Sequence, residues 1–275
     1  LVLSFAPSCV RRAEPDPVAD AYRSTVDRIR EAGLSGERAH RILTRICSVG
    51  PRLTGSPGAA AAVDESLKLM EEMGLQDVHS EPVEVGRWVR GETAEAVLLA
   101  SGTREAMPLA VCALGGSVGT PAGGLTAPVV EVRSLADAAA LGRAAEGKIL
   151  FFNRPMDRRL TEPFAAYGGA ADQRVAGASA AARVGAVAVL VRSLTFREDL
   201  NPHTGMLKYD ADAPRIPAAA VATLDADRLS EVLKKEREVA VSLRLPIFPT
   251  SCKRAANSRF LFSEGERPSL SAIRT

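Results

Sequence analysis

The sequence predicts an α/β or α+β protein, and two features of its pattern support this class. The first quarter of the chain carries apolar residues at the three- and four-residue spacing of amphipathic helices. From about residue 77, short strand-like runs alternate with alanine-rich helical runs. The 275 residues are 46% hydrophobic and 25% charged, which is typical of a globular protein with one large or two medium domains.

Three helices are expected to lead the chain. Asp16-Pro17 and Ser56-Pro57 each combine a capping side chain with a proline at the first helical position. A second helix opens at Ser35, and its apolar stripe continues without interruption to Cys47. We therefore expect helices over residues 17–33, 35–47 and 57–73.

The rest of the chain is expected to contain a sheet and further helices. The expected strands are residues 78–85, 94–100, 109–113, 128–132, 148–152, 186–191, 216–221 and 239–245. The expected helices are residues 134–145, 172–183 and 225–237. Glu81-Pro82 marks the first strand as an edge strand, because proline cannot donate to a neighbour. Residues 246–275 show neither helical nor strand periodicity, and they are expected to form a divergent, poorly ordered tail.

The N-terminal segment predicts export. It begins without methionine, as expected of a sequence that starts partway through a gene. Its apolar run ends in small residues, which resembles the end of a secretory signal. The segment ending at Cys9 also loosely resembles a bacterial lipoprotein cleavage box. We therefore expect a secreted or periplasmic protein, with anchoring through a lipidated Cys9 as a further expectation; an arbitrary apolar terminus is the alternative. No other stretch has the 18 or so apolar residues of a membrane span.

Composition and short motifs exclude several functions. The net charge is only +2, from 35 basic and 33 acidic residues, and shows no basic footprint for nucleic acid. The glycine-rich residues 115–119 lack the Lys and Ser/Thr of a phosphate loop, so a flexible turn is expected there. No Gly-x-Ser-x-Gly elbow supports a serine hydrolase.

Few residues are suited to bind a metal. Of three histidines, His40 is expected on a helix and His203 in a turn. His79 and Glu81 have the spacing that places two ligands on one side of a strand, but catalytic zinc usually needs three protein ligands. No CxxC pair occurs, and Cys47 and Cys112 are expected to be buried as small apolar residues. We assign no catalytic, cofactor-binding or metal-binding residue in this chain.

Several segments carry a resemblance to a known family. Residues 52–58 (RLTGSPG), followed by a helix that ends in EMGL, resemble the opening of zinc exopeptidases of the aminopeptidase Y type. Residues 78–83 and 87–92 are similar to the plasma glutamate carboxypeptidase, or carboxypeptidase Q, family. The sequences of residues 146–154 and 178–191 resemble a protease-associated domain. Residues 201–205 and 214–217 resemble the same carboxypeptidases.

This resemblance implies an architecture. Residues 1–16 would be the remnant of a signal segment and a linker, and residues 17–95 the N-terminal helices of a zinc exopeptidase domain. Residues 96–245 would be an inserted protease-associated domain, with a mixed sheet or β-sandwich flanked by helices. That domain is expected to have its own core, whereas the leading helices pack less completely.

The resemblance also implies a chemistry that this chain is not expected to perform alone. In this family, two zinc ions activate a water molecule that attacks the peptide bond. The residues that bind these ions follow the protease-associated domain in sequence. Residues 246–275 contain no histidine and no aspartate. We therefore expect a truncated metallo-exopeptidase for peptides or dipeptides, inactive alone and without bound zinc. The alternative is a non-catalytic protease-associated module that binds peptides or proteins. A homodimer is a further expectation.

Overall fold

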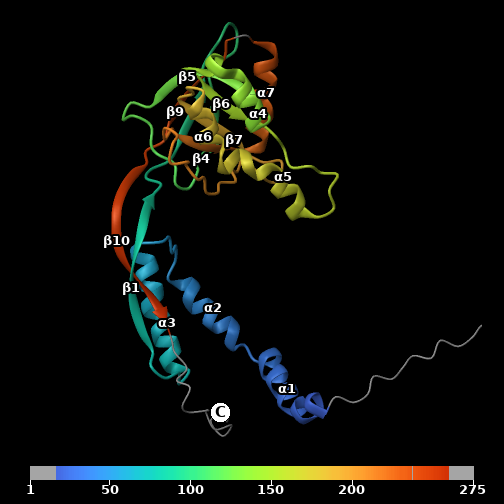
Figure 1. Ribbon diagram of the computed structural model, residues 1–275, viewed down its shortest axis with the longest axis vertical. Coiled ribbons are helices and arrows are strands. Elements are labelled where there is room, and N and C mark those ends of the chain that lie inside the picture. Colours follow the sequence, from blue (N-terminus) through green and yellow to red (C-terminus); the bar gives the residue numbers. More distant parts are fainter. Residues whose placement is uncertain (1–16, 237, 260–275) are drawn as a thin grey trace, which may run out of the picture. The chain divides into compact units, whose positions relative to one another are not determined.

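The computed structural model describes residues 17–236 and 238–259 (Figure 1). The chain divides into two compact units. Among the described residues, the first contains residues 17–85 and 254–259, and the second lies between Gly86 and Lys253. Strands β1 (His79–Val89) and β10 (Phe248–Arg259) each cross a boundary between the units.

The first unit begins with three helices, as the sequence predicts. They are α1 (Pro17–Ser35), α2 (Arg38–Ser48) and α3 (Pro57–Glu72). The hydroxyl of Ser56 accepts a hydrogen bond from the amide of Ala59 at 3.1 Å, so Ser56 caps α3 and Pro57 occupies its first position. The cap and proline of the sequence pattern therefore set the start of this helix.

These helices bury little of their apolar surface. No residue of α2 is buried, and Leu69 is the buried residue of α3. On α1, the apolar stripe formed by Tyr22, Val26 and Ile29 remains 57–66% exposed. Helices α2 and α3 are joined instead by Arg45, which lies 2.7 Å from Glu65 and also pairs with Glu72. The expectation of incomplete packing in the leading helices is confirmed.

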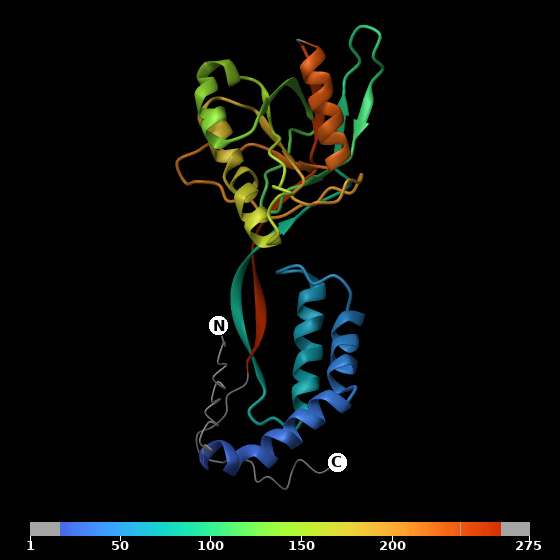
Figure 2. The same cartoon turned by 90° about the vertical axis from the view of Figure 1, so that its right-hand side faces the viewer.

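Two long strands form a separate two-stranded sheet (Figure 2). They are β1 (His79–Val89) and β10 (Phe248–Arg259). The sequence pattern predicts no regular element after residue 245, whereas β10 occupies part of that tail. A strand can form there without an apolar period because pairing with β1 satisfies its backbone groups. Residues 260–275 lie outside the described residues.

The second unit is built on one sheet of eight strands. They are β2 (Glu95–Leu98), β3 (Met107–Leu109), β4 (Val111–Ala113), β5 (Leu125–Val132), β6 (Ile149–Phe152), β7 (Ala188–Arg192), β8 (Ala218–Val221) and β9 (Ala240–Arg244). The strand order is β3-β2-β9-β5-β6-β7-β8-β4. Strands β5 to β8 are mutually parallel, and the remaining neighbours pair antiparallel. The sheet is therefore mixed.

The sheet is nearly closed because its two outer strands are consecutive in sequence. Only Ala110 separates β3 from β4, although these strands stand at opposite ends of the strand order. The amide of Ala110 donates to Asp225 at 2.7 Å, and its carbonyl accepts from the amide of Ala222 at 2.9 Å. The expected single strand over residues 109–113 is thus wrong, since the chain changes partners at Ala110.

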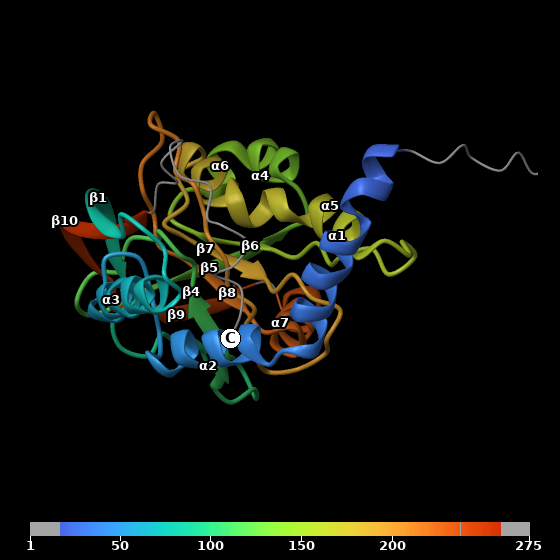
Figure 3. The same cartoon turned by 90° about the horizontal axis from the view of Figure 1, so that it is seen from below.

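Helices cover the two faces of this sheet (Figure 3). They are α4 (Leu135–Leu141), which continues as a 3-10 turn through residues 142–145, α5 (Pro163–Val175), α6 (Gly177–Arg183) and α7 (Thr223–Lys235). Helix α5 starts well before the expected residue 172. The two glycines at 168 and 169 weaken the helical signal of its first turns.

Alternate residues of the central strands pack against different helices. On β6, Ile149 and Phe151 belong to a core cluster that includes Leu229 of α7. Leu150 and Phe152 of the same strand belong to a second cluster, together with alanines of α4 and α6. A continuous apolar run in a short strand is typical of a strand buried on both faces. The predicted mixed α/β class is confirmed.

Among the described residues, no helix has the length and the apolar composition needed to cross a lipid bilayer.

Candidate functional site

The parallel strands of the second unit place several functional side chains at one edge of the sheet. Arg133 follows β5, Asn153 follows β6, and Arg192 ends β7. In parallel sheets, ligands bind outside the carboxyl ends of the strands, because the connecting loops leave a crevice there. Two pockets of the second unit are lined by residues that follow these ends.

The first pocket is polar and has a volume of about 240 Å³. Glu131 contacts two residues that line this pocket: it accepts hydrogen bonds from Asn153 at 2.8 Å and from Ser230 at 2.7 Å. Arg192 pairs with Asp227 at 2.5 Å and also donates to Asn153. The buried polar atoms that carry this network have partners within it. The network therefore stabilises the sheet edge and leaves no free charge for a ligand at its base.

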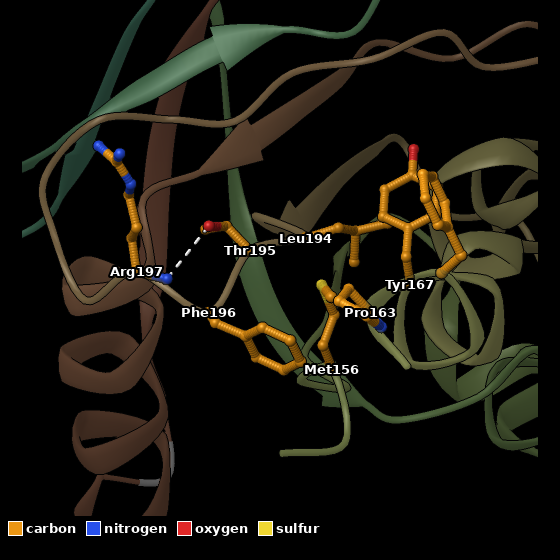
Figure 4. Close-up of a pocket in the computed structure, with 8 residues that line it drawn as sticks. Met156, Pro163, Tyr167, Leu194, Thr195, Phe196 and Arg197 are labelled. Carbon is orange, nitrogen blue, oxygen red and sulfur yellow. Dashed lines mark hydrogen bonds between the residues drawn. The ribbon is translucent and has the colours of Figure 1, made fainter. Parts of the chain in front are cut away.

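The second pocket is apolar and has a volume of about 480 Å³. It is lined by Met156, Pro163, Phe164, Tyr167, Leu194, Thr195, Phe196 and Arg197. In Figure 4, Met156, Pro163, Leu194 and Phe196 face one another, whereas Arg197 is directed away from them at the rim. The volume lies within the roughly 300–1,000 Å³ usual for ligand pockets.

Two loops and the start of α5 build this apolar pocket. Glu162 accepts hydrogen bonds from the amides of Phe164, at 3.0 Å, and Ala165, and so caps α5. Pro163 occupies the first position of the helix. The next turn carries Tyr167 over the pocket. The opposite side comes from residues 194–197, which follow β7.

Three arginines surround the apolar pocket and differ in their partners. Arg158 lies over the Phe196 ring and pairs with Glu198 at 2.6 Å. Arg174 is 9% exposed, stacks on the ring of Tyr167 and donates to its hydroxyl. Within the part of the chain that the structure describes, the guanidinium of Arg197 has no hydrogen-bond or ion-pair partner. Arg197 is thus the rim cation available to a ligand.

The predicted histidines do not form one site. His40 is exposed on α2, and the amide of His203 donates to Ser193 at 2.8 Å. His79 Nε2 lies 3.8 Å from a carboxylate oxygen of Glu81, which confirms that the two face the same side of β1. The other ring nitrogen of His79 lies 2.8 Å from the carbonyl of Asp77. A carboxylate oxygen of Asp77 also lies 3.8 Å from this Nδ1 atom, so the two nearby acids face opposite ring nitrogens and do not meet at one of them.

Zinc does not fit the side chains that the structure describes. Over residues 17–236 and 238–259, no group of three or more His, Cys, Asp and Glu side chains is placed to hold a metal ion. A catalytic zinc ion usually has three protein ligands.

Two other expectations need correction. Cys47 is exposed and Cys112 only half-buried, because α2 is poorly covered and β4 is an edge strand of the sheet. Residues 115–119 contain a turn at Gly116, as expected, but hydrogen bonds hold this segment in place. The hydroxyl of Ser117 accepts from the amide of Ala218 at 2.9 Å, and Val118 donates to Tyr209 at 3.1 Å. Sequence alone does not show these distant partners.

The residues of the apolar pocket were not singled out from the sequence. Phe164, Phe196 and Arg197 stand in two segments about thirty positions apart, and neither segment contains a known motif. The available signals were Glu162-Pro163, which has the form of a helix start, and an apolar strand directly before residue 194. Only the parallel pairing of β6 with β7 brings the two segments together.

No protein-family model matches the chain. Its sequence is 34% identical over 229 residues to carboxypeptidase Q of Xenopus laevis, and 33% identical over 205 residues to that of Homo sapiens. These alignments cover 82% and 74% of the chain, but only 46% and 41% of the two relatives. The chain therefore spans less than half the length of these relatives.

Solved structures give a consistent result. The chain resembles a peptidase M28 precursor from Shewanella amazonensis with a TM-score of 0.78 and 34% identity, over 87% of this chain and 53% of that one. An aminopeptidase from Aneurinibacillus shares the fold with a TM-score of 0.51 and 18% identity, over 80% of this chain and 46% of that one.

The fold and these similarities place the chain in the class of the M28-type peptidases. Within that class, the chain belongs to the family of carboxypeptidase Q. The resemblance stated from the sequence is confirmed at this level.

Proposed function

We propose that this chain is the N-terminal portion of a carboxypeptidase Q-like metallo-exopeptidase that acts on peptides or dipeptides. The observation that carries the proposal is 34% identity over 82% of the chain to a carboxypeptidase Q. In this proposal, residues 96–245 are the protease-associated domain, and residues 17–95 begin the peptidase domain. Export to a secreted or periplasmic location and a homodimeric state belong to the same proposal. Cys9, the proposed lipid anchor, lies outside the described residues.

We propose further that the 275-residue chain alone neither binds zinc tightly nor hydrolyses peptides. A di-zinc site needs several carboxylates and histidines that converge and are held by surrounding hydrogen bonds. His79 and Glu81 supply two ligands at most, and those are held on one strand. Two ligands of this kind would bind zinc weakly and exchange it readily.

Zinc titration of the purified chain by calorimetry tests this second proposal. We expect weak binding without a defined stoichiometry, and no amino acid released from a dipeptide in the presence of zinc. His79→Ala is the informative variant and His40→Ala the matched control, since His40 is exposed on α2. Tight stoichiometric binding that His79→Ala abolishes would contradict the proposal, as would zinc-dependent dipeptide hydrolysis.

A chimera tests the family function directly. Residues 17–245 would replace the corresponding segment of the frog carboxypeptidase Q, which supplies the remaining length. We expect the folded chimera to release amino acids from dipeptides, and a metal chelator to stop the reaction. A chimera that folds and binds zinc but leaves dipeptides intact would contradict the proposal that this segment serves an exopeptidase.

A second candidate function is a peptide- or protein-binding module without catalysis. The apolar pocket of the second unit favours it, because its lining residues lie within the compact unit Gly86–Lys253. Binding of peptides by the 275-residue chain, in the absence of hydrolysis, separates this function from the first.

A further inference from the structure

The apolar pocket is open to solvent on the side of α5. Phe164 lines it and is 84% exposed. Leu160 and Leu200, in the two loops that border the pocket, are 44% and 48% exposed but do not line it. Single exposed apolar side chains are ordinary, whereas an exposed aromatic side chain that lines an apolar hollow is typical of an interaction surface. An open hollow of this kind allows an extended chain to pass across it, rather than enclosing a small molecule.

The charge at the rim of the pocket further restricts the kind of ligand that can bind. Arg158 is neutralised by Glu198, whereas the Arg197 guanidinium has no counter-ion within the described part of the chain. Its amide is held to the Thr195 hydroxyl at 3.1 Å, which anchors the backbone while the side chain extends into water. A carboxylate beside the pocket would therefore find an unoccupied cation there.

We propose that this pocket is an exosite for an internal segment of a polypeptide. A large apolar side chain of that segment fills the pocket, and a neighbouring Asp or Glu side chain pairs with Arg197. The inference rests on the proposed function only in taking a polypeptide as the ligand. It assigns recognition to a part of the ligand away from its termini, which the exopeptidase function does not require.

Short peptides blocked at both ends test the exosite with the full 275-residue chain. The first peptide carries Phe and Glu, the second replaces Glu by Gln, and the third replaces Phe by Ala. We expect the second to bind about two- to five-fold more weakly than the first, as for an exposed ion pair. The third should bind at least about five-fold more weakly, as for loss of an interface anchor. Fluorescence anisotropy of labelled peptides measures each affinity.

Variants locate the two contacts. Arg197→Gln should remove the difference between the Glu and Gln peptides, and leave the affinity for the Gln peptide unchanged. Phe164→Ala should weaken both peptides alike, and its 84% exposure leaves the core intact, which a thermal melt checks. Arg143→Gln is the control, because Arg143 is exposed on the 3-10 turn after α4 and does not line the pocket.

Three outcomes would overturn the exosite. Equal affinity for all three peptides would mean that the pocket does not recognise either side chain. A further version of the Gln peptide has a free C-terminus. If its affinity matched that of the blocked Glu peptide, the pocket would recognise a terminal carboxylate rather than an internal side chain. A dimer that Phe164→Ala dissociates would assign the pocket to a second copy of the chain. Because blocked peptides offer no end to an exopeptidase, failure of the exosite and failure of the proposed hydrolysis are separate results.

Discussion

At the scale of single residues, an ion pair joins two distant parts of the second unit. Arg104, in the loop after β2, lies 2.8 Å from Glu236, just after α7, and the two side chains are 20% and 27% exposed. The hydrogen bond from Arg104 holds the pKa of Glu236 below its ordinary value of 4.5. Since the folded state then favours the ionised carboxylate, the pair stabilises the fold above that pH.

This pair predicts a pH-dependent effect of Glu236→Gln. A carboxyl whose folded pKa is lowered contributes stability above its unfolded pKa, and that contribution is lost as the pH falls through the folded value. We expect the variant to melt below the wild type at pH 7, and the difference to shrink as the pH is lowered below 4.5. Melting temperatures measured from pH 7 down into this acid range test it. Glu105→Gln, at an exposed neighbouring position, is the control. A difference that persists unchanged in acid would contradict the ionic explanation.

At the scale of elements, two glycines of the second unit differ in the space that surrounds them. A Cβ atom at Gly119 would lie 2.9 Å from the backbone carbonyl oxygens of Leu245 and Ile247, which follow β9. Backbone atoms cannot move aside as the end of a flexible side chain can. A Cβ atom at Gly168, inside α5, would meet no heavy atom within 4 Å.

These surroundings predict opposite signs for the same substitution. Gly119→Ala should destabilise the chain by about 1–3 kcal/mol, as overpacking does. Gly168→Ala should stabilise it by about 0.5–1 kcal/mol, because alanine loses less conformational entropy in a helix. Urea unfolding followed by circular dichroism measures both. Two effects of the same sign would mean that the close approach at Gly119 is absent or that α5 is not a continuous helix.

At the scale of the whole molecule, stability is distributed unevenly between the two units. In the second unit, both faces of the sheet carry buried apolar clusters, and Phe151 and Phe152 are fully buried. In the first unit, α2 buries no residue, and Tyr22, Val26 and Ile29 of α1 remain exposed. Segments with few buried contacts open locally at low free-energy cost.

Limited proteolysis of the purified chain tests this difference. We expect the first cuts within α1 and α2, while the fragment Gly86–Lys253 persists. Mass spectrometry of the fragments over time identifies the order, and hydrogen exchange of the uncut chain provides an independent measure of local opening. If α1 and α2 outlast the second unit, then contacts that the structure does not show protect them, and the assignment of low local stability is wrong.

Sequence patterns predicted the elements better than their partners. The cap at Ser56 and the apolar runs of β6 and β7 are local features, and the elements form close to where these features predict them. The split at Ala110 was not predictable, because residues 109–113 form one unbroken apolar run. The start of α5 was missed since Gly168 and Gly169 interrupt the helical pattern.

The sequence by itself therefore determined the mixed α/β class, most helix starts and the kinship to the carboxypeptidase Q family, since each of these depends on residues near one another in the chain. Only the tertiary structure decided that β3 and β4 stand at opposite ends of one strand order. It likewise decided that Phe164 and Phe196 line one pocket. Contacts of this kind depend on the order in which strands pair, and the residues that line a pocket need no common local pattern.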